Sequence, residues 1–404
     1  MGNPPYPRSI AAKLRNGVSE FEKLYIEEEH NLYTNGDLLK VRQICELGTR
    51  TFPRSFYFHE DLGQYLNALG QYDLGLQETR EALRIVPDDG FLYRQLVHSY
   101  LLLNRVDEGE TAVREARARN LDGSLGDVLY EIAFYRNDAA EMARQADRAA
   151  HKLGEADLFL ALEADTAAYS GHLQKARELS LRAAQSAQQE QEKEVATTYL
   201  AVSAFREGLF GNVAVARQQT PDLGAGPLGR DLGFAVALAF SYAGDAKRAQ
   251  AVAERLNKQF PEDTILQFNY LPALRGKLGL LRANPQDALH SLNVAVPYEL
   301  GLPALSFYNW PNLYPVYVRG EAYLAAHQGR EAAAEFQKIL DHRGIVLNEP
   351  IGALAHLQLG RAYAMQGDLA KARAAYNDFL TLWKEADPDI PVLKEAKAEY
   401  AKLQ

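Results

Sequence analysis

The chain has 404 residues, of which 47% are hydrophobic and 24% are charged, and its formal net charge at pH 7 is −9. The hydrophobic share can supply an extensive core. The acidic balance argues against nucleic acid as the main partner, because binding to phosphates needs an excess of Lys and Arg. The single cysteine, Cys45, excludes a disulfide framework and a cysteine zinc site within one chain, and we interpret it as a small buried core residue. No stretch approaches 18 unbroken apolar residues, so we expect no membrane insertion by this chain.

The first 21 residues differ from the sequence that follows. They contain neither an apolar stretch of secretory length nor a small-residue cleavage site. The segment SIAAKLRNGVSE is typical of the end of a second helix whose first helix is missing. We therefore expect 1–21 to be the remnant of a preceding repeat, and the chain to be cut from a longer protein or to be a natural truncation.

From residue 22 onward, turn residues recur at a fixed interval. Gly36, Gly70 and Asn104 lie 34 residues apart, and Pro53 and Pro87 keep the same step. Glycine and asparagine tolerate a left-handed backbone after a helix, and proline cannot continue one. A period of 34 is that of the tetratricopeptide repeat (TPR), a helix–turn–helix unit that buries its apolar face only by stacking on its neighbours. The pattern predicts an all-α, right-handed superhelical solenoid of stacked TPR units.

Residues 56–89 show the repeat most clearly. Gly63, in the first predicted helix, offers a small side chain where two backbones must approach closely. The second predicted helix ends before Pro87 and carries an inward stripe at helical spacing. The stripe consists of Tyr72, Gly75, Thr79 and Ala82.

Further units drift from this period but remain recognisable. The step from Gly171 to Gly211 is 40 residues, which predicts longer helices around QSAQQEQEKE. In all we expect about ten helix pairs, closed by an amphipathic capping helix at 391–404, because the open end of a solenoid requires a polar outer face. Second helices are expected to open after Asn137, Gly171, Gly211, Gly244 and Asn284.

Breaks in the spacing indicate the domain organisation. Residues 221–230, PDLGAGPLGR, are the stretch richest in Gly and Pro, and we expect a hinge there. It would separate an N-terminal array, 22–220, from a C-terminal array, 231–390. Two long connections, 296–315 and 341–352, interrupt the C-terminal array, and the first of them is rich in aromatic residues.

Several segments carry more information than the generic repeat. The stretch from Tyr317 to Pro391, which contains GEAYLAAHQGREAAAEFQKIL and LGRAYAMQGDLAKARAAYNDFL, resembles the C-terminal TPR region of bacterial receptor-type Ser/Thr protein kinases. The segments ALEADTAAYSGHLQKARELS, FPEDTILQFNYLPALR and VSEFEKLYIEEEHNLYTNGD resemble other parts of that region, so the resemblance covers most of the chain. It implies a sensor or interaction module in kinase-linked signalling. Similar TPR regions also follow DNA-binding domains in some bacterial regulators, which leaves the attached domain open.

No kinase chemistry accompanies this resemblance. The chain has no Gly-rich phosphate loop, no HRD catalytic loop, no DFG and no APE. We therefore expect no enzymatic activity, no catalytic residue and no cofactor.

Three other motifs are better explained without chemistry. His59 and Glu60 begin like a zinc-protease helix, but Gly63 stands where the second His is needed, so we expect no metal site. The run from Glu27 to His30 is interpreted as a solvated helix face, because consecutive residues on a helix point in different directions. The glycines of GAGPLGRDLG lack the Lys-Ser/Thr and the preceding strand of a phosphate loop, and are interpreted as a plain loop.

The first helices of stacked TPR units line a concave groove, and their non-core positions can contact a ligand. Here those positions combine aromatic and hydrogen-bonding side chains, which is typical of a peptide-binding groove. Alternatively they are only the exposed positions of a spacer, although aromatics exposed at matching positions favour binding. The acidic residues argue against capture of a C-terminal carboxylate, as in chaperone-binding TPR proteins. The predicted binding face consists of Tyr57, Glu60, Asp61, Gln64, Asn67, Phe91, Arg94, Gln95 and His98.

The aromatic connection at 296–315 provides a second candidate site. It contains Phe307, Tyr308, Trp310 and Tyr314. A loop of this length has a structural or functional reason, and we favour a plug that folds back on the solenoid over a ligand site. In either case Trp310 is expected to be ordered.

These expectations converge on a non-catalytic module that binds a protein or peptide, as the scaffold or sensor of a bacterial signalling protein. Two alternatives stay open. One is a sensor that closes around a small molecule or short peptide inside the superhelix, and the other is a structural spacer or oligomerisation module. No nucleic acid is expected as a partner. We expect a soluble chain, cytoplasmic if it is complete and extracytoplasmic if it derives from a membrane-anchored kinase, while the sequence leaves the oligomeric state open.

Overall fold

A computed structural model describes residues 17–150, 152, 154–224, 226–302 and 313–403. In these residues the chain forms α-helices joined by loops and short 3-10 and π segments, and contains no β-strand. The helices of the described ranges follow one another as ten packed pairs and a final single helix, an all-α superhelix of stacked helix pairs, which confirms the predicted fold class. The pairs are α2 (Glu20–His30) with α3 (Leu38–Thr51), α4 (Phe56–Ala68) with α5 (Tyr72–Ile85), α6 (Gly90–Leu102) with α7 (Val106–Ala118), α8 (Gly126–Arg136) with α9 (Ala139–Ala149), α10 (Ala156–Tyr169) with α11 (Leu173–Gln189), α12 (Lys193–Leu209) with α13 (Val213–Gln219), α14 (Arg230–Tyr242) with α15 (Ala246–Gln259), α16 (Leu271–Leu281) with α17 (Pro285–Leu292), α18 (Tyr314–Ala325) with α19 (Gly329–Asp341), and α21 (Pro350–Met365) with α22 (Leu369–Leu382). The remaining elements are α20 (Arg343–Val346), α23 (Pro391–Ala401), the 3-10 segments η2 (Asp122–Ser124) and η4 (Asn293–Ala295), and the π segments η1 (Asn31–Asn35) and η3 (Leu266–Tyr270).

In the first three helix pairs, the residue at the turn between the two helices has the predicted left-handed backbone. Gly36, Gly70 and Asn104 have φ angles of 69°, 77° and 57°. Glycine and asparagine adopt this conformation at lower cost than other residues, because a larger Cβ substituent clashes with the following carbonyl. The second helices α3 and α5 each end two residues before a proline, as the pattern predicted.

Two predicted packing details are also confirmed. A Cβ on Gly63 in α4 would lie 3.1 Å from the carbonyl oxygen of Gly75 in α5, so this residue does permit a close approach of two helices. The 40-residue step between Gly171 and Gly211 corresponds to two long helices, since α11 and α12 have 17 residues each.

The two ends of the described chain are closed by local interactions. Ser19 forms a capping box at the start of α2: its hydroxyl accepts from the Glu22 amide, and the Glu22 carboxylate accepts from the Ser19 amide at 2.8 Å. Residues 20 and 21 therefore belong to the first helix pair. Residues 1–16 lie outside the described ranges, so the expected N-terminal remnant stays a prediction. At the other end, α23 packs against α22.

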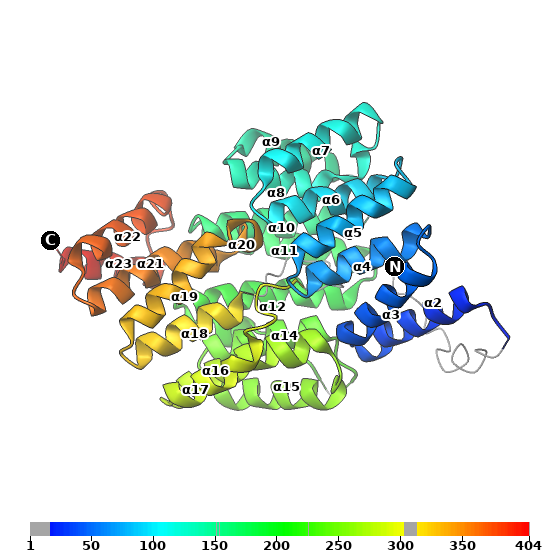
Figure 1. Cartoon of the computed structure of the whole chain (residues 1–404). Coiled ribbons are helices and arrows are strands. Elements are labelled where there is room, and N and C mark those ends of the chain that lie inside the picture. The colour runs from blue at the N-terminus through cyan, green and yellow to red at the C-terminus, as the bar shows by residue number, and fades with distance from the viewer. Residues whose placement is uncertain (1–16, 151, 153, 225, 303–312, 404) are drawn as a thin grey trace.

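The superhelix winds so that its early and late repeats touch (Figure 1). We call α2–α13 the N-terminal array and α14–α23 the C-terminal array. The segment after α17, for example, lies against the α4–α5 turn, where a Cβ on Gly70 would be 3.0 Å from the Gly301 amide nitrogen. We call the line of contact between the two arrays the seam. It joins Gly36 with Thr264, Gly70 with Gly301, Asn104 with Gly344, Gly171 with Asp387, and Phe210 with Val392.

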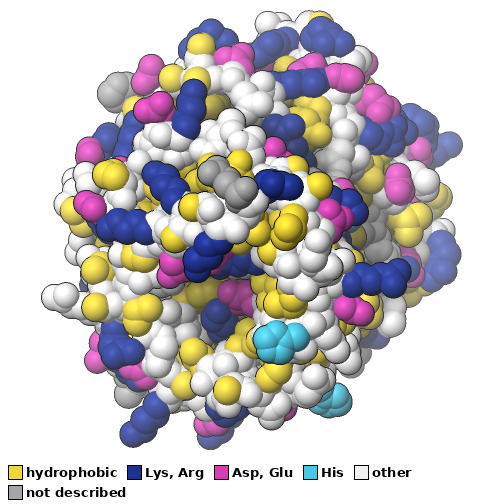
Figure 2. All heavy atoms as spheres, turned by 90° about the vertical axis from the view of Figure 1, so that its left-hand side faces the viewer, with side chains coloured by type: hydrophobic (Ala, Val, Ile, Leu, Met, Phe, Trp, Pro, Cys, Tyr) yellow, Lys and Arg dark blue, Asp and Glu magenta, His cyan; other side chains and the backbone are white. Residues whose placement is uncertain are grey.

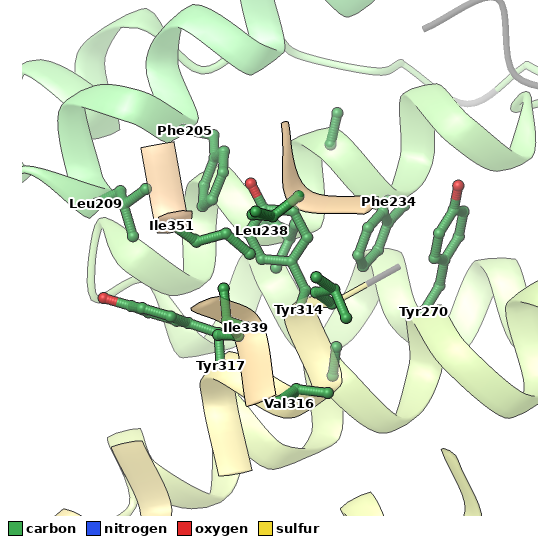
Figure 3. Packing of buried hydrophobic residues seen from close by; sticks show 14 of the residues in the cluster. Phe205, Leu209, Phe234, Leu238, Tyr270, Tyr314, Val316, Tyr317, Ile339 and Ile351 are labelled. Atoms are coloured by element: carbon green, nitrogen blue, oxygen red, sulfur yellow. The ribbon is translucent and has the colours of Figure 1, made fainter. Parts of the chain in front are cut away.

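The hydrophobic core continues from one array into the other. Figure 3 shows Phe205 of α12, Phe234 of α14, Tyr314 of α18 and Ile351 of α21 in one cluster of buried residues. The rings of Phe205 and Tyr314 meet edge to face at 5.4 Å, and Phe234 stacks on Tyr270 at 3.8 Å. The arrays are therefore joined by a shared core as well as by their surfaces.

Candidate binding site

The predicted binding face lies on α4 and α6, and the structure places neighbouring first helices next to it. Tyr57 of α4 donates a hydrogen bond to Glu28 of α2 at 2.5 Å. On the other side, the Gln95 amide of α6 donates to the Glu60 carbonyl of α4 at 2.9 Å. The predicted residues thus lie between α2 and α8, along one series of first helices.

Glu28 is the centre of a cluster that our interpretation of the sequence missed. Its side chain is fully buried, not solvated as the sequence interpretation held, and accepts hydrogen bonds from Tyr57 at 2.5 Å and from Tyr65 at 2.6 Å. Burial raises the pKa of the Glu28 carboxyl, while the two hydroxyl donors lower it. A signal was available, because Glu28 follows the buried Leu24 by four residues and shares its helix face.

Two more carboxyl groups of the predicted face have strongly perturbed pKa values. Burial and the neighbouring Glu28 raise the pKa of Asp61 to about 8, although its hydrogen bond with Tyr57 opposes this. Burial and the charge of Asp89 raise the pKa of Glu60 to about 7. Within the described ranges, none of the ion pairs involves Glu28, Glu60 or Asp61. These carboxyl groups therefore crowd together without a compensating cation from this part of the chain.

Aromatic rings flank the same carboxyl groups. Tyr25 of α2 is 40% exposed and its ring lies 5.2 Å from that of Tyr57. Phe91, at the start of α6, is 43% exposed. Burial raises the pKa of Tyr25, and the negative charges of Glu28 and Asp61 raise it further. We call Tyr25, Glu28, Tyr57, Glu60 and Asp61 the acidic-aromatic cluster.

Other residues of the predicted face are already engaged inside the protein. Asn67 and Gln95 are both 6% exposed, so they are core positions and not the exposed ones that the register implied. Their amide groups hold neighbouring first helices together, since Asn67 donates to Ser99 at 2.8 Å and Gln95 donates to α4. Arg94 forms a bidentate ion pair with Asp127 of α8. These three side chains contribute to the framework of the site.

His98 and Gln64 complete the predicted face. His98 lies 4.0 Å from the buried Glu131 of α8, and burial together with the charge of Arg94 lowers its pKa to about 4. It is therefore a neutral imidazole at pH 7. Gln64 is half-buried on α4.

Polar contacts of this kind connect first helices along the whole superhelix. Each of these contacts ties one first helix to the next one along the chain, which helps to fix the face that the first helices share. The contacts pair Tyr57 with Glu28, Arg94 with Asp127, Asp157 with Tyr199, Asp165 with Arg206, Asp231 with Tyr270, Lys277 with Glu321, and Arg361 with Glu399.

The second candidate site is described only at its last residue. Phe307, Tyr308 and Trp310 lie outside the described residues, so the ordered plug stays a prediction. Tyr314 is 1% exposed and donates a hydrogen bond to Glu349 at 2.9 Å. It is a core residue at the start of α18.

A pocket of about 570 Å³ lies across the seam. From the N-terminal array it is lined by Asn137 and Tyr169, and all its other walls belong to the C-terminal array. Its volume falls in the usual range for small-molecule sites. The residue pattern does not indicate this pocket, because its walls come from segments that are far apart along the chain. The C-terminal array contributes Leu340, Arg343, Val346, Gly352, His356, Asn377, Asp378, Thr381 and Leu382.

Three further observations on the described residues concern metal ligands, membrane helices and surface charge. They contain no group of three or more His, Cys, Asp or Glu side chains placed to hold a metal ion. His59, the start of the zinc-protease-like motif, instead contacts Glu78 at 2.6 Å. None of the helices in the described ranges combines the length and apolar character that crossing a bilayer requires. Figure 2 shows basic and acidic side chains interspersed over the face on the C-terminal side, with no large area of one sign.

Comparisons with solved structures give distant likenesses. No family model and no curated protein sequence matches the chain. Among solved structures, the TPR domain of P58(IPK) is similar at 13% identity and a TM-score of 0.28, over 95% of this chain and 98% of that one. Yeast Tom70 is similar at 11% identity and a TM-score of 0.30, over 98% and 96% of the two chains. The Cut9–Hcn1 hetero-tetramer of APC/C is similar at 12% identity and a TM-score of 0.31, over 98% and 94%. At these values the function has to be argued from the site itself.

Proposed function

We propose that this chain is a non-catalytic module that binds a peptide segment of another protein, and that this segment presents a Lys or Arg side chain to the acidic-aromatic cluster. The observation that carries the proposal is the set of carboxyl groups at Glu28, Glu60 and Asp61 beside tyrosine rings, without a cation from the described chain.

The chemistry of the cluster favours a cation over an anion or a neutral group. A carboxyl group in a half-buried place loses hydration, so a cation brought close to it interacts more strongly than in water. Tyr25 and Tyr57 add ring faces that attract cations. A bound cation would also lower the raised pKa values of Asp61 and Glu60 and release protons at neutral pH.

A labelled peptide tests the proposal directly. The probe is a fluorescent peptide with a central Lys or Arg between apolar residues, and its neutral counterpart carries acetyl-lysine or citrulline. We expect the cationic peptide to bind more tightly at pH 8.5 than at pH 6, because Asp61 and Glu60 must be ionised. Asp61→Asn should weaken binding about tenfold and flatten this pH dependence.

The matched control removes the same charge elsewhere. Glu262 is exposed on the C-terminal array, so Glu262→Gln lowers the net negative charge without touching the cluster. It should leave the affinity unchanged. Equal affinity of the wild type and Asp61→Asn, or equal binding of the cationic and neutral peptides, would overturn the proposal.

We also propose that the module belongs to a bacterial signalling protein, where it serves as a scaffold or sensor. The support is the resemblance of residues 317–391 and of three further segments to the TPR region of receptor-type kinases. A pull-down from the source organism with the wild type and with Tyr57→Ala/Phe91→Ala tests both parts together. Signalling proteins captured by the wild type and lost with the variant would support the proposal, and identical captures would contradict it.

The pocket across the seam favours a second candidate function, a sensor for a small molecule or short peptide. A ligand that touches Tyr169 on one side and Arg343 or Asp378 on the other would hold the two arrays together. Such a ligand should raise the melting temperature and, if the arrays separate in solution, lower the radius of gyration in X-ray scattering. A panel of amino acids, short peptides and sugars that changes neither quantity would count against a sensor.

A further inference from the structure

The seam is built largely from the turn residues of the N-terminal array. Asn104 has both ends of its amide engaged: its Nδ2 donates to the Asp341 carbonyl at 2.9 Å, and its Oδ1 accepts from the Gly344 amide at 2.7 Å. Next to it, Arg343 donates to the Tyr135 carbonyl at 2.7 Å and lies over the Tyr135 ring at 4.4 Å. Asn104, a left-handed residue that forms a repeat turn, therefore also docks α20.

The first turn is joined to the C-terminal array by two hydrogen bonds. The Thr264 amide donates to the Gly36 carbonyl at 3.0 Å, and the Thr264 hydroxyl accepts from the Leu38 amide at 3.0 Å. The second turn is joined where the Tyr72 hydroxyl donates to the Leu300 carbonyl. In both turns, a side chain thus forms a hydrogen bond with a main-chain atom that lies more than two hundred residues away in the sequence.

The fifth turn is joined through the end of α22 and the loop that follows it. The Trp383 indole donates to the Tyr169 carbonyl at 2.9 Å, and the Asp387 amide donates to the Gly171 carbonyl at 3.0 Å. Trp383 is 1% exposed, and a Cβ on Gly171 would lie 2.9 Å from its ring. Further along, the Val392 amide donates to the Phe210 carbonyl at 3.2 Å.

Apolar contacts accompany these hydrogen bonds. Leu347, which follows α20, is 5% exposed and belongs to the cluster formed by Leu101, Val97 and other residues of the N-terminal array. Phe205 and Tyr314 meet across the arrays as described above. An interface that is both apolar and hydrogen-bonded does not open readily, unlike the small polar contacts between mobile domains.

The loop at 221–230, where the sequence predicted a hinge, is itself attached to α15. Arg255 donates to the Gly224 carbonyl at 2.9 Å, and Gln259 donates to the Leu228 carbonyl at 2.7 Å. The described part of this loop therefore belongs with α15 in the C-terminal array.

We propose that the seam is a clasp that closes the superhelix and makes the two arrays one cooperative unit. In an open solenoid each repeat contacts only its neighbours, and repeats can unfold locally from either end. Here every turn from the first to the sixth is joined by a hydrogen bond to a distant part of the C-terminal array. Loss of one contact should therefore loosen the others, and the acidic-aromatic cluster and the seam pocket are held in one fixed shape.

The variant Asn104→Gly removes a single contact of the clasp without straining the turn. Glycine accepts the φ of 57° at this position, so the helix pair α6–α7 can keep its geometry while the two amide hydrogen bonds are lost. Asn120→Gly is the matched control, because Asn120 has a φ of 59° and an exposed side chain and takes no part in the seam contacts described above. Comparison of the two variants removes the entropic effect of the new glycine.

Hydrogen exchange and tryptophan fluorescence provide the readout. In a Trp310→Phe background Trp383 is the sole tryptophan, and it reports on the seam. We expect urea to change Trp383 fluorescence and helical circular dichroism in one coincident transition, with a lower midpoint in Asn104→Gly than in Asn120→Gly. Amides at 383–392, far from the substitution, should exchange on the order of tenfold faster in Asn104→Gly.

Two results would overturn the clasp. The first is faster exchange confined to 341–347, which would mean that the contacts act independently. The second is a change in Trp383 fluorescence well below the urea concentration at which helicity is lost, which would mean that the arrays part before they unfold.

Discussion

Gly48 of α3 lies flat against the ring of Phe58 of α4, so close that a Cβ at residue 48 would overlap the ring atoms. Phe58 is fully buried and packs with Phe21 at 5.0 Å. The small residue and the large ring form a matched pair at the contact between the first and second repeats. This contact fixes how α2 and α4, which carry the acidic-aromatic cluster, stand relative to each other.

Gly48→Ala should therefore destabilise the protein by about 1–3 kcal/mol through overpacking, even though alanine is the better helix former. Gly109 in α7 provides the control, since it also lies within a second helix but a Cβ there would meet its nearest neighbour only at 3.5 Å. Gly109→Ala should be neutral or stabilising by up to about 1 kcal/mol. Urea unfolding of both variants measures the difference, and the same sign of change in both would refute the packing argument.

The raised pKa values in the cluster predict a stability that falls as the pH rises. Asp61 and Glu60 keep their protons in the folded chain up to about pH 8 and about pH 7, whereas in the unfolded chain they titrate near their usual values. Between these limits the folded state binds more protons than the unfolded state. The stabilisation is therefore complete below the usual carboxyl pKa values, falls as the pH rises above them, and is lost once the pH has risen through about 7 to 8.

Asp61→Asn should reduce this dependence, so that the variant gains stability relative to the wild type at pH 8.5. The urea midpoint measured from pH 5 to pH 8.5 tests it, with Glu262→Gln as the variant expected to follow the wild type. A wild-type midpoint that stays constant or rises over this range would show that the carboxyl groups are ionised throughout.

Removal of the buried charge of Arg319 should have a large effect on the stability of the protein. The Arg319 guanidinium donates to Glu299 at 2.7 Å and to Glu335 at 2.6 Å, and the residue is 3% exposed. Arg319→Met would leave two carboxylates with Lys338 as their one cation partner among the described residues, and should cost about 3–5 kcal/mol. Arg282→Met, which removes an exposed pair with Asp287 at 3.0 Å, should cost less than about 1 kcal/mol. Urea unfolding measures both costs. Similar urea midpoints for Arg319→Met and Arg282→Met would contradict a role for burial.

The helix pairs could be predicted because their signals are local. A turn residue such as Gly70 must tolerate a left-handed backbone, so the requirement is written into the residue type at a regular interval. The seam left no such signal, because most of its hydrogen bonds end on main-chain carbonyls such as those of Asp341 and Tyr169. Every residue carries a carbonyl, so neither the partner nor the register can be recognised from composition.

The candidate site could be predicted in part, because the repeat register is also a local signal. The repeat register brought Tyr57, Glu60 and Asp61 to one face, and the structure places them together, although ligand binding there stays a prediction. Glu28 was missed because a run of three glutamates is usually solvated, and only its distance of four residues from Leu24 indicated burial. Gln95 shows the opposite error, since a polar residue at a first-helix position serves as a bridge between helices.

The thiol of Cys45 allows a simple assay of whether the first repeats are folded. Cys45 is fully buried, and burial raises the pKa of its thiol, so that the reactive thiolate is scarce in the folded protein. A thiol reagent such as DTNB should therefore react only as fast as the protein opens, while one thiol per chain reacts at once in denaturant. If the arrays form one cooperative unit, Asn104→Gly should speed the labelling of Cys45 although residue 104 lies two repeats away, and Asn120→Gly should not. Rapid labelling of the native wild type would show that α3 is accessible without global opening.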